Sequence, residues 1–99
     1  MNDIYDKMAN LETPSVLDEA RAIVNGDRNK AYGKPEESFT TISNYWETYL
    51  GIDISPKDVA MMMILLKVAR NEHKAKRDNL VDICGYAACA EKIMNAESL

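Results

Sequence analysis

The sequence predicts an all-α fold, a compact bundle of about four helices. In four segments apolar residues recur every three or four positions, a spacing that places them on one side of a helix. Glycines and prolines fall between these segments, where helices end and begin. No segment alternates between apolar and polar residues for long enough to predict a strand. We expect residues 1–13 to form a polar arm or short helix and residues 14–99 to form a single helical domain.

The first predicted helix covers about residues 14–25. Ser15 followed by Asp18 resembles a capping box, and Gly26 is suited to stop a helix in the left-handed conformation. The residues from Gly26 to Lys34 are expected to form a polar loop between two glycines. The apolar stripe of the helix is formed by Val16, Leu17, Ala20, Ile23 and Val24.

The second predicted helix covers residues 35–50. Pro35 suits the first helical turn, and Glu36 and Glu37 are favourable beside the positive end of the helix dipole. Gly51 is expected to end the helix. The residues at helical spacing are Phe39, Ile42, Trp46, Tyr49 and Leu50, and Trp46 is expected in the core.

The third predicted helix has the strongest start signal in the chain. Ser55, Pro56 and Asp58 supply an N-cap residue, a proline at the first helical position and an acid at the third. Residues 59–66 are apolar on every face, and the helix is expected to run to about Asn71. A helix that is apolar all round is buried all round, so we expect it to be the central helix or to face another subunit. Because a bundle of this size is marginal alone, a homo-oligomer is expected.

The fourth predicted helix begins near Arg77 or Asp78 and runs to about Asn95. Gly85 and several alanines allow close contact with neighbouring helices. Cys84 and Cys89 are five positions apart, so they point to different faces and are expected to be free, buried thiols. With no second cysteine pair, a zinc site is not predicted.

Composition excludes several classes of function. The chain has 99 residues and a net charge of −4, which argues against general nucleic-acid binding. The longest apolar run is too short to span a membrane, and the N-terminus lacks the pattern of a secretory signal. A soluble, cytoplasmic protein is therefore expected. Charge is uneven, however, because residues 28–77 carry a net +3, which favours attraction of a small anion.

The first group of candidate site residues lies in the expected loop. Arg28, Lys30 and Lys34 precede a helix N-terminus, where cations and backbone amides together favour phosphate binding. Tyr32 is suited to stack on a base. The alternative is a plain connection with solvated charges.

Two further groups lie on the third and fourth helices. Lys67 and Arg70 share one helical face, as do Asp78, Asp82 and Tyr86. These residues predict either an internal salt-bridge network between the two helices or a ligand site. A metal site is the less favoured alternative, because two aspartates supply too few oxygen ligands for a hard divalent cation. The single histidine, His73, is expected to be a solvated residue at a helix end.

Several short motifs resemble a family of small phage and prophage proteins defined by a domain of unknown function. The resemblance covers about residues 15–90. It implies a phage origin, an infected bacterial host and an all-helical fold, but no established activity. The motifs are Gly26-Asp27-Arg28, Tyr32-Gly33-x-Pro35, Phe39, Trp46, Tyr49-Leu50-Gly51, Ser55-Pro56-x-Asp58-Val59-Ala60, Lys67-x-Ala69-Arg70 and Asp78-x-Leu80-Val81-Asp82-Ile83-x-Gly85-Tyr86.

A more distant likeness is to the all-α, MazG-like nucleoside triphosphate pyrophosphohydrolases. In that family a late helix carries an acidic pair before an apolar run, and here Asn79-x-x-Asp82 stands in that place, with Asp78 just before it. The family also uses an earlier E-x-x-E helix to complete a magnesium site. This chain has no E-x-x-E, so the likeness does not extend to that site.

Three functions are consistent with these patterns. The favoured one is binding of a nucleotide-like phosphorylated ligand without turnover or cofactor, with a host immune signal as the class of ligand sequestered. The first alternative is a divergent magnesium-dependent pyrophosphohydrolase, and the second is a module that binds a host protein. The predicted ligand-binding residues are Arg28, Lys30, Tyr32, Lys34, Lys67, Arg70, Asp78, Asp82 and Tyr86.

Overall fold

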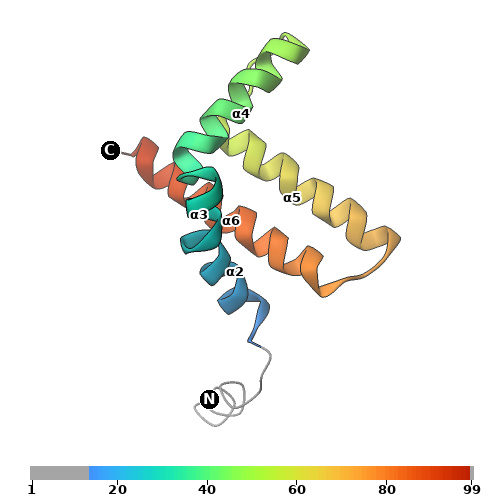
Figure 1. Cartoon of the computed structure of the whole chain (residues 1–99). Helices are drawn as coiled ribbons and strands as arrows, with labels where there is room; N and C mark the ends of the chain where they lie inside the picture. Colours follow the sequence, from blue (N-terminus) through green and yellow to red (C-terminus); the bar gives the residue numbers. More distant parts are fainter. Residues whose placement is uncertain (1–13, 99) are drawn as a thin grey trace.

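The protein is all-α, as predicted (Figure 1). The computed structural model describes residues 14–98, so the expected arm over residues 1–13 lies outside the described residues. Between residues 14 and 98 no strand occurs. The helices are α2 (Val16–Asn25), α3 (Asp27–Tyr32), α4 (Pro35–Leu50), α5 (Pro56–His73) and α6 (Arg77–Glu97).

The helices begin where local chemistry predicted. Ser15 Oγ accepts a hydrogen bond from the Asp18 backbone N–H at 3.1 Å, which caps α2. At α5 the capping box is complete, because Ser55 Oγ accepts from Asp58 N–H at 3.0 Å and Asp58 Oδ2 accepts from Ser55 N–H at 2.9 Å. Gly51 ends α4 in the left-handed conformation, with φ of 70°.

The prediction of a loop between Gly26 and Lys34 is wrong. Asp27 to Tyr32 form the short helix α3, because nothing between the two glycines prevents a hydrogen-bonded turn. Gly26 is also not left-handed, since its φ is −120°. Its role is steric, because a Cβ at this position would lie 2.8 Å from the Ala22 carbonyl oxygen.

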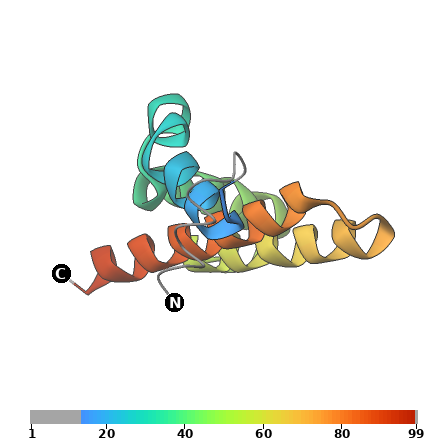
Figure 2. The same cartoon turned by 90° about the horizontal axis from the view of Figure 1, so that it is seen from below.

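The central helix is α6, which packs against α2, α4 and α5. Helices α5 and α6 form a hairpin and lie side by side in both views (Figures 1 and 2). Within the described chain, α2 and α5 do not contact each other. The buried core draws on all the longer helices and on the segment that leads into α5: Val24, Phe39, Ile54, Val59, Ala60, Cys89, Ala90 and Ile93.

Of the two alternatives for the third helix, a central position is therefore wrong, and contact with another subunit stays a prediction. Val59 and Ala60 at the start of α5 are fully buried, but the described residues do not cover the outward face of the helix. The reason is that, within residues 14–98, α5 has neighbours on one side only, where α6 and α4 pack. The exposed residues on the other side are Met61, Met62, Leu65, Leu66 and Val68.

Helix α4 is also only partly packed. Its first half carries the buried Phe39, whereas its C-terminal end projects beyond the other helices (Figure 1). Trp46 is half-buried and packs against the core, and Tyr49 at the tip is 88% exposed. The Glu47 carboxylate accepts a hydrogen bond from Ile54 N–H at 2.8 Å, which ties the returning segment to the projecting end. Among residues 14–98, no helix is long and apolar enough to cross a membrane.

Candidate functional site

A pocket of about 420 Å³ lies between the helices, and every helix from α2 to α6 contributes to its wall. This volume is typical of small-molecule sites. Most of the lining is apolar, with a few polar groups at defined places, which is the usual make-up of a ligand pocket. The apolar and aromatic side chains in the wall are Ala20, Ile23, Val24, Phe39, Ile42, Trp46, Val59, Met63, Val81 and Cys89.

Helix α3 places a cation beside an aromatic ring at this pocket. The Arg28 guanidinium carbon lies 5.8 Å from the centroid of the Tyr32 ring, within the range of a cation–π contact. Both residues line the pocket and both are exposed to solvent. Since they are four positions apart on one helix, the short turn that replaces the expected loop is what holds them together.

Asn29 supplies an unpartnered acceptor in the same wall. Its Oδ1 is buried and has no hydrogen-bond partner in the described structure. Buried polar atoms are nearly always paired, but this oxygen has almost no accessible surface, so a donor in the pocket would reach it only after the Asn29 side chain rotates. Sequence analysis missed Asn29, because nothing in the polar run around it distinguishes this side chain from its solvated neighbours.

On the opposite side, α6 contributes Asp82, Gly85 and Tyr86. Asp82 Oδ2 pairs with Lys67 Nζ at 2.8 Å, and the two side chains are only 25% and 15% exposed. This pair is one of the salt bridges predicted between the third and fourth helices. Because Lys67 neutralises Asp82, Arg28 is the uncompensated charge among the described side chains that line the pocket.

Aromatic rings surround the apolar part of the pocket. The Phe39 and Tyr86 rings lie 6.3 Å apart with an interplanar angle of 50°, and Trp46 lines the pocket from further along α4. Tilted pairs of this kind are favourable and hold both rings in place. The pocket can therefore accept a flat ring system.

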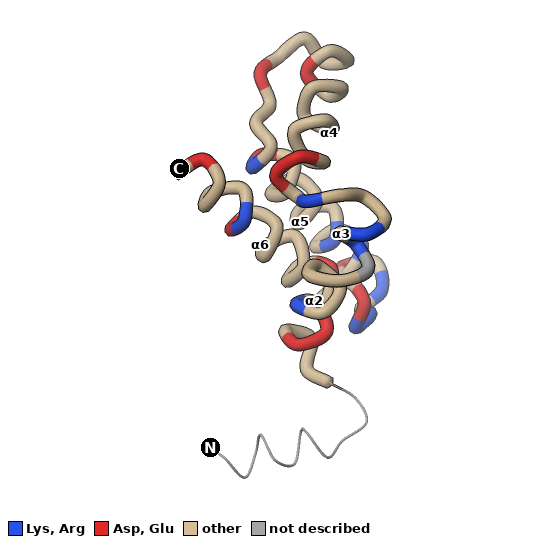
Figure 3. Tube along the Cα trace, turned by 60° about the vertical axis from the view of Figure 1, so that its left-hand side comes forward, with Lys and Arg blue, Asp and Glu red and all other residues tan. Residues whose placement is uncertain are grey.

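The structure brings together four of the predicted ligand-binding residues, Arg28, Tyr32, Asp82 and Tyr86, and places Lys67 behind Asp82. Lys30, Lys34, Arg70 and Asp78 are exposed and do not line the pocket. Lys34 directly precedes the acidic first turn of α4, so opposite charges adjoin at the α3–α4 junction (Figure 3). Within residues 14–98, Arg70 and Asp78 form no ion pair.

The two cysteines differ in environment. Both are free, Cys84 is half-buried, and Cys89 is buried in the pocket wall. Burial raises the pKa of the Cys89 thiol above its usual value of 9.0, an effect that nearby Arg28 opposes. Cys89 is therefore a neutral thiol at physiological pH. His73 is exposed at the end of α5, as predicted.

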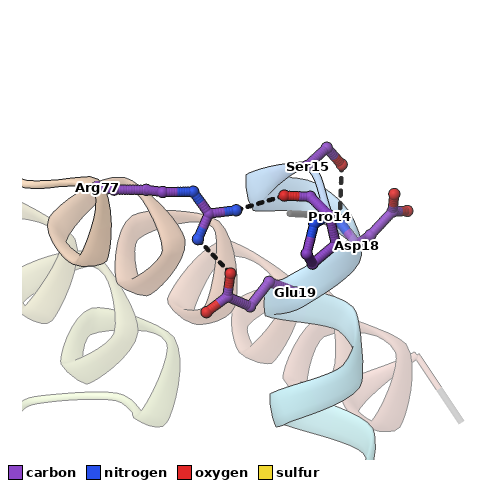
Figure 4. Close-up of polar contacts among 5 residues, drawn as sticks. All are labelled: Pro14, Ser15, Asp18, Glu19 and Arg77. Carbon is purple, nitrogen blue, oxygen red and sulfur yellow. Dashed lines mark hydrogen bonds and ion pairs between the residues drawn. The ribbon is translucent and has the colours of Figure 1, made fainter. Parts of the chain in front are cut away.

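A second polar cluster joins the starts of α2 and α6 (Figure 4). The Arg77 guanidinium donates to the Glu19 carboxylate and to the Pro14 carbonyl oxygen. Beside them Ser15 caps α2 through Asp18. These contacts lie away from the pocket-lining residues and fix one helix against another. Among residues 14–98, no group of three His, Cys, Asp or Glu side chains could hold a metal ion.

Comparison with known proteins places this arrangement in a family. The domain of unknown function DUF6378 matches residues 15–94. The chain belongs to this family. The DUF6378 match includes every residue of the pocket wall and confirms the expected resemblance to a family of unknown function.

The relatives of this DUF6378 chain are phage proteins. The chain is 45% identical over 80 residues to the Gene 55 protein of Mycobacterium phage D29, covering 80% of this chain and 53% of the relative. It is 44% identical over 85 residues to the Gene 55 protein of Mycobacterium phage L5, covering 84% of this chain and 54% of the relative. The chain thus spans about half the length of the curated relatives it matches. No solved structure matches the chain significantly.

Proposed function

We propose that this DUF6378 domain binds a nucleotide-like ligand, with the base in the pocket and a phosphate at Arg28. The observation that carries the proposal is the solvent-exposed Arg28 in the wall of an otherwise apolar, aromatic-walled pocket. An apolar ligand would leave both Asn29 and Arg28 unused. A free anion would leave the aromatic wall unused.

The inner part of the pocket suits a flat heterocycle. Bases stack on aromatic side chains with useful affinity, and Trp46, Phe39 and Tyr86 offer such surfaces. With the Asn29 side chain rotated toward the pocket, an exocyclic amino group or ring N–H of a base would donate to Asn29 Oδ1. This bond would satisfy the buried acceptor and set the orientation of the ring.

Arg28 suits the anionic end of the ligand. A guanidinium binds phosphate through two parallel hydrogen bonds, and Arg28 is exposed to solvent while it lines the pocket. Lys30 and Lys34 lie close to it in the chain, and as exposed cations they would add to the local positive potential without direct contact. Lys67, by contrast, is committed to Asp82.

The finer proposal is that the ligand is held without turnover. A magnesium-dependent pyrophosphohydrolase would need Asp82 as a metal ligand, but Asp82 is already paired with Lys67. Asp78 is exposed and lies outside the pocket wall. A protein that binds a nucleotide intact withdraws it from solution. With phage proteins as relatives, a host signalling nucleotide is the class of ligand whose withdrawal would serve a purpose.

Equilibrium titration with AMP, adenosine and inorganic phosphate tests whether the base binds in the inner pocket and the phosphate at Arg28. We expect AMP to bind more tightly than either part alone. Arg28→Met should weaken AMP binding by about tenfold, because a charge-assisted hydrogen bond is lost, and should leave adenosine unaffected. Arg21→Met removes an exposed arginine of α2 that does not line the pocket, and serves as the matched control.

Two results would contradict the proposal. One is the absence of binding by AMP, ATP and cyclic AMP alike. The other is equal weakening by Arg28→Met and Arg21→Met, which would indicate a diffuse charge effect. Conversion of ATP to AMP and pyrophosphate in the presence of magnesium would instead support the pyrophosphohydrolase alternative.

A further inference from the structure

Helix α5 directs a charged side chain inward and several apolar side chains outward. Its outward surface, here called the α5 face, consists of Met61, Met62, Leu65, Leu66 and Val68, which are between 38% and 66% exposed. These positions follow helical spacing, so they form one continuous stripe. The charged residue within this stretch, Lys67, instead points inward to Asp82 and is 15% exposed. The helix thus buries a charge and exposes its apolar side.

The α5 face has the size of an apolar patch that often marks an interaction site. On the scale of side-chain areas its five partly exposed residues present on the order of 400 Å² of apolar surface, about half of what one partner gives to a standard interface. Stable interfaces have such an apolar centre surrounded by a polar rim. Here the rim is present at both ends of the stripe, where Lys57 and Asp58 lie at the start of the helix and Glu72 and His73 at its end.

We propose that a second copy of this chain covers the α5 face, with the two α5 helices packed antiparallel about a twofold axis near Leu65. The rim charges favour this direction. In a parallel twofold pair each rim residue would meet its own copy, so Asp58 would face the partner's Asp58 and Glu72 the partner's Glu72. With the axis between Ile64 and Leu65, the antiparallel pair brings Lys57 level with the partner's Glu72 and Asp58 level with the partner's Asn71.

The proposal also accounts for the composition of α5. Residues 59–66 contain no charged or polar side chain, a pattern typical of a helix buried on all sides. Within one chain α6 and α4 cover one side of α5. A second α5 would cover the other side, and α5 would become the centre of the assembly. This inference rests on the α5 face alone and is independent of the pocket ligand.

Sedimentation velocity over a wide range of concentrations tests the proposal on the full chain. We expect the wild-type protein to sediment as a dimer at micromolar concentrations. Leu65→Glu should raise the dimer dissociation constant by more than tenfold, because it places two carboxylates at the twofold axis. Leu17→Glu is the matched control, since Leu17 on α2 is 67% exposed and Leu65 is 66% exposed. The control should remain a dimer.

Circular dichroism shows whether Leu65→Glu keeps its helices. If it does not, Leu65→Cys in a Cys84→Ser background keeps the test decisive, because a short bis-maleimide should then link two chains through the introduced thiols. Leu17→Cys in the same background should not be linked. A wild-type monomer at all concentrations overturns the proposal and leaves the α5 face to another partner. A Leu65→Glu dimer as tight as wild type, or equal cross-linking at positions 17 and 65, also overturns it.

Discussion

Lys67 Nζ on α5 lies 2.8 Å from Asp82 Oδ2 on α6, and this ion pair forms part of the framework of the pocket. It joins the two longest helices of the described chain at a point where both side chains are mostly buried. The pair explains why α5 directs its charge inward. It also removes Asp82 from the set of groups free to bind a ligand or a metal.

Removing one member of this pair should lower the free energy of unfolding more than removing both members together. Asp82→Ala leaves a half-buried ammonium without its partner, so we expect the free energy of unfolding to fall by about 1–3 kcal/mol. Lys67→Met should cost less, because its apolar chain still packs on α6. Denaturant unfolding of both single variants and the double variant measures the coupling. Strictly additive losses would contradict a stabilising Lys67–Asp82 pair.

The capping box of α5 should make stability depend on pH in the acid range. The Ser55 backbone N–H, followed by the Ser55 hydroxyl, holds the pKa of Asp58 below its usual 3.8. A lowered pKa in the folded state means that the contribution is fully present above 3.8 and is lost as the pH falls through the folded value. Asp58→Ala should therefore lower the Tm at neutral pH, and the difference from wild type should shrink in strong acid. Asp53→Ala, an exposed acid outside the helices, is the control, and an equal, pH-independent loss in both variants would refute the capping role.

The same substitution at two glycines should change stability in opposite directions. At Gly85 a Cβ would lie 3.6 Å from Val24 Cγ2, an ordinary contact, so Gly85→Ala should stabilise the protein by about 0.5–1 kcal/mol through helix propensity. At Gly26 a Cβ would lie 2.8 Å from the Ala22 carbonyl oxygen, so Gly26→Ala should destabilise the α2–α3 junction. Thermal unfolding of the two variants measures both effects. A stabilising Gly26→Ala would show that this junction is not held as described.

The two thiols should react at different rates. Cys84 is half-buried, whereas Cys89 is buried in the pocket wall with a raised pKa. Because the thiolate is the reactive form, a maleimide at neutral pH should modify Cys84 first and Cys89 only slowly. Mass spectrometry of digested samples identifies the modified site at each time. If a nucleotide occupies the pocket, it should slow Cys89 further and leave Cys84 unchanged, and faster reaction at Cys89 would contradict its burial.

Local signals predicted most of the fold, and long-range packing determined the rest. Ser15, Ser55 and the prolines at the starts of α4 and α5 located helix starts correctly because capping acts within one turn. The contact between Arg77 and Glu19 joins residues 58 positions apart, and no local pattern indicates it. The apolar run of α5 predicted burial either within the chain or against another subunit, but the sequence could not specify which neighbour covers its outer side.

The candidate site was predictable only in its charged and aromatic members. Arg28 and Tyr32 stood out as a cation and a ring in a basic segment before a helix N-terminus, whereas Asp82 and Tyr86 stood out because they share a helical face. Asn29 did not, since its importance comes from an amide oxygen that packing leaves buried and unpaired. Lys30 and Lys34 have the same chemistry as Arg28, but the turn of α3 and its end place them outside the pocket wall.

The most direct test of nucleotide binding is a two-dimensional NMR titration of the isotope-labelled chain with AMP, ATP and cyclic AMP. We predict saturable shifts centred on Arg28, Asn29, Gly85 and Tyr86, with the Asn29 side-chain amide among the largest. Residues of the α5 face should not respond. Saturating nucleotide that leaves the pocket residues unshifted, or shifts confined to the α5 face, would contradict a nucleotide-binding pocket in this domain.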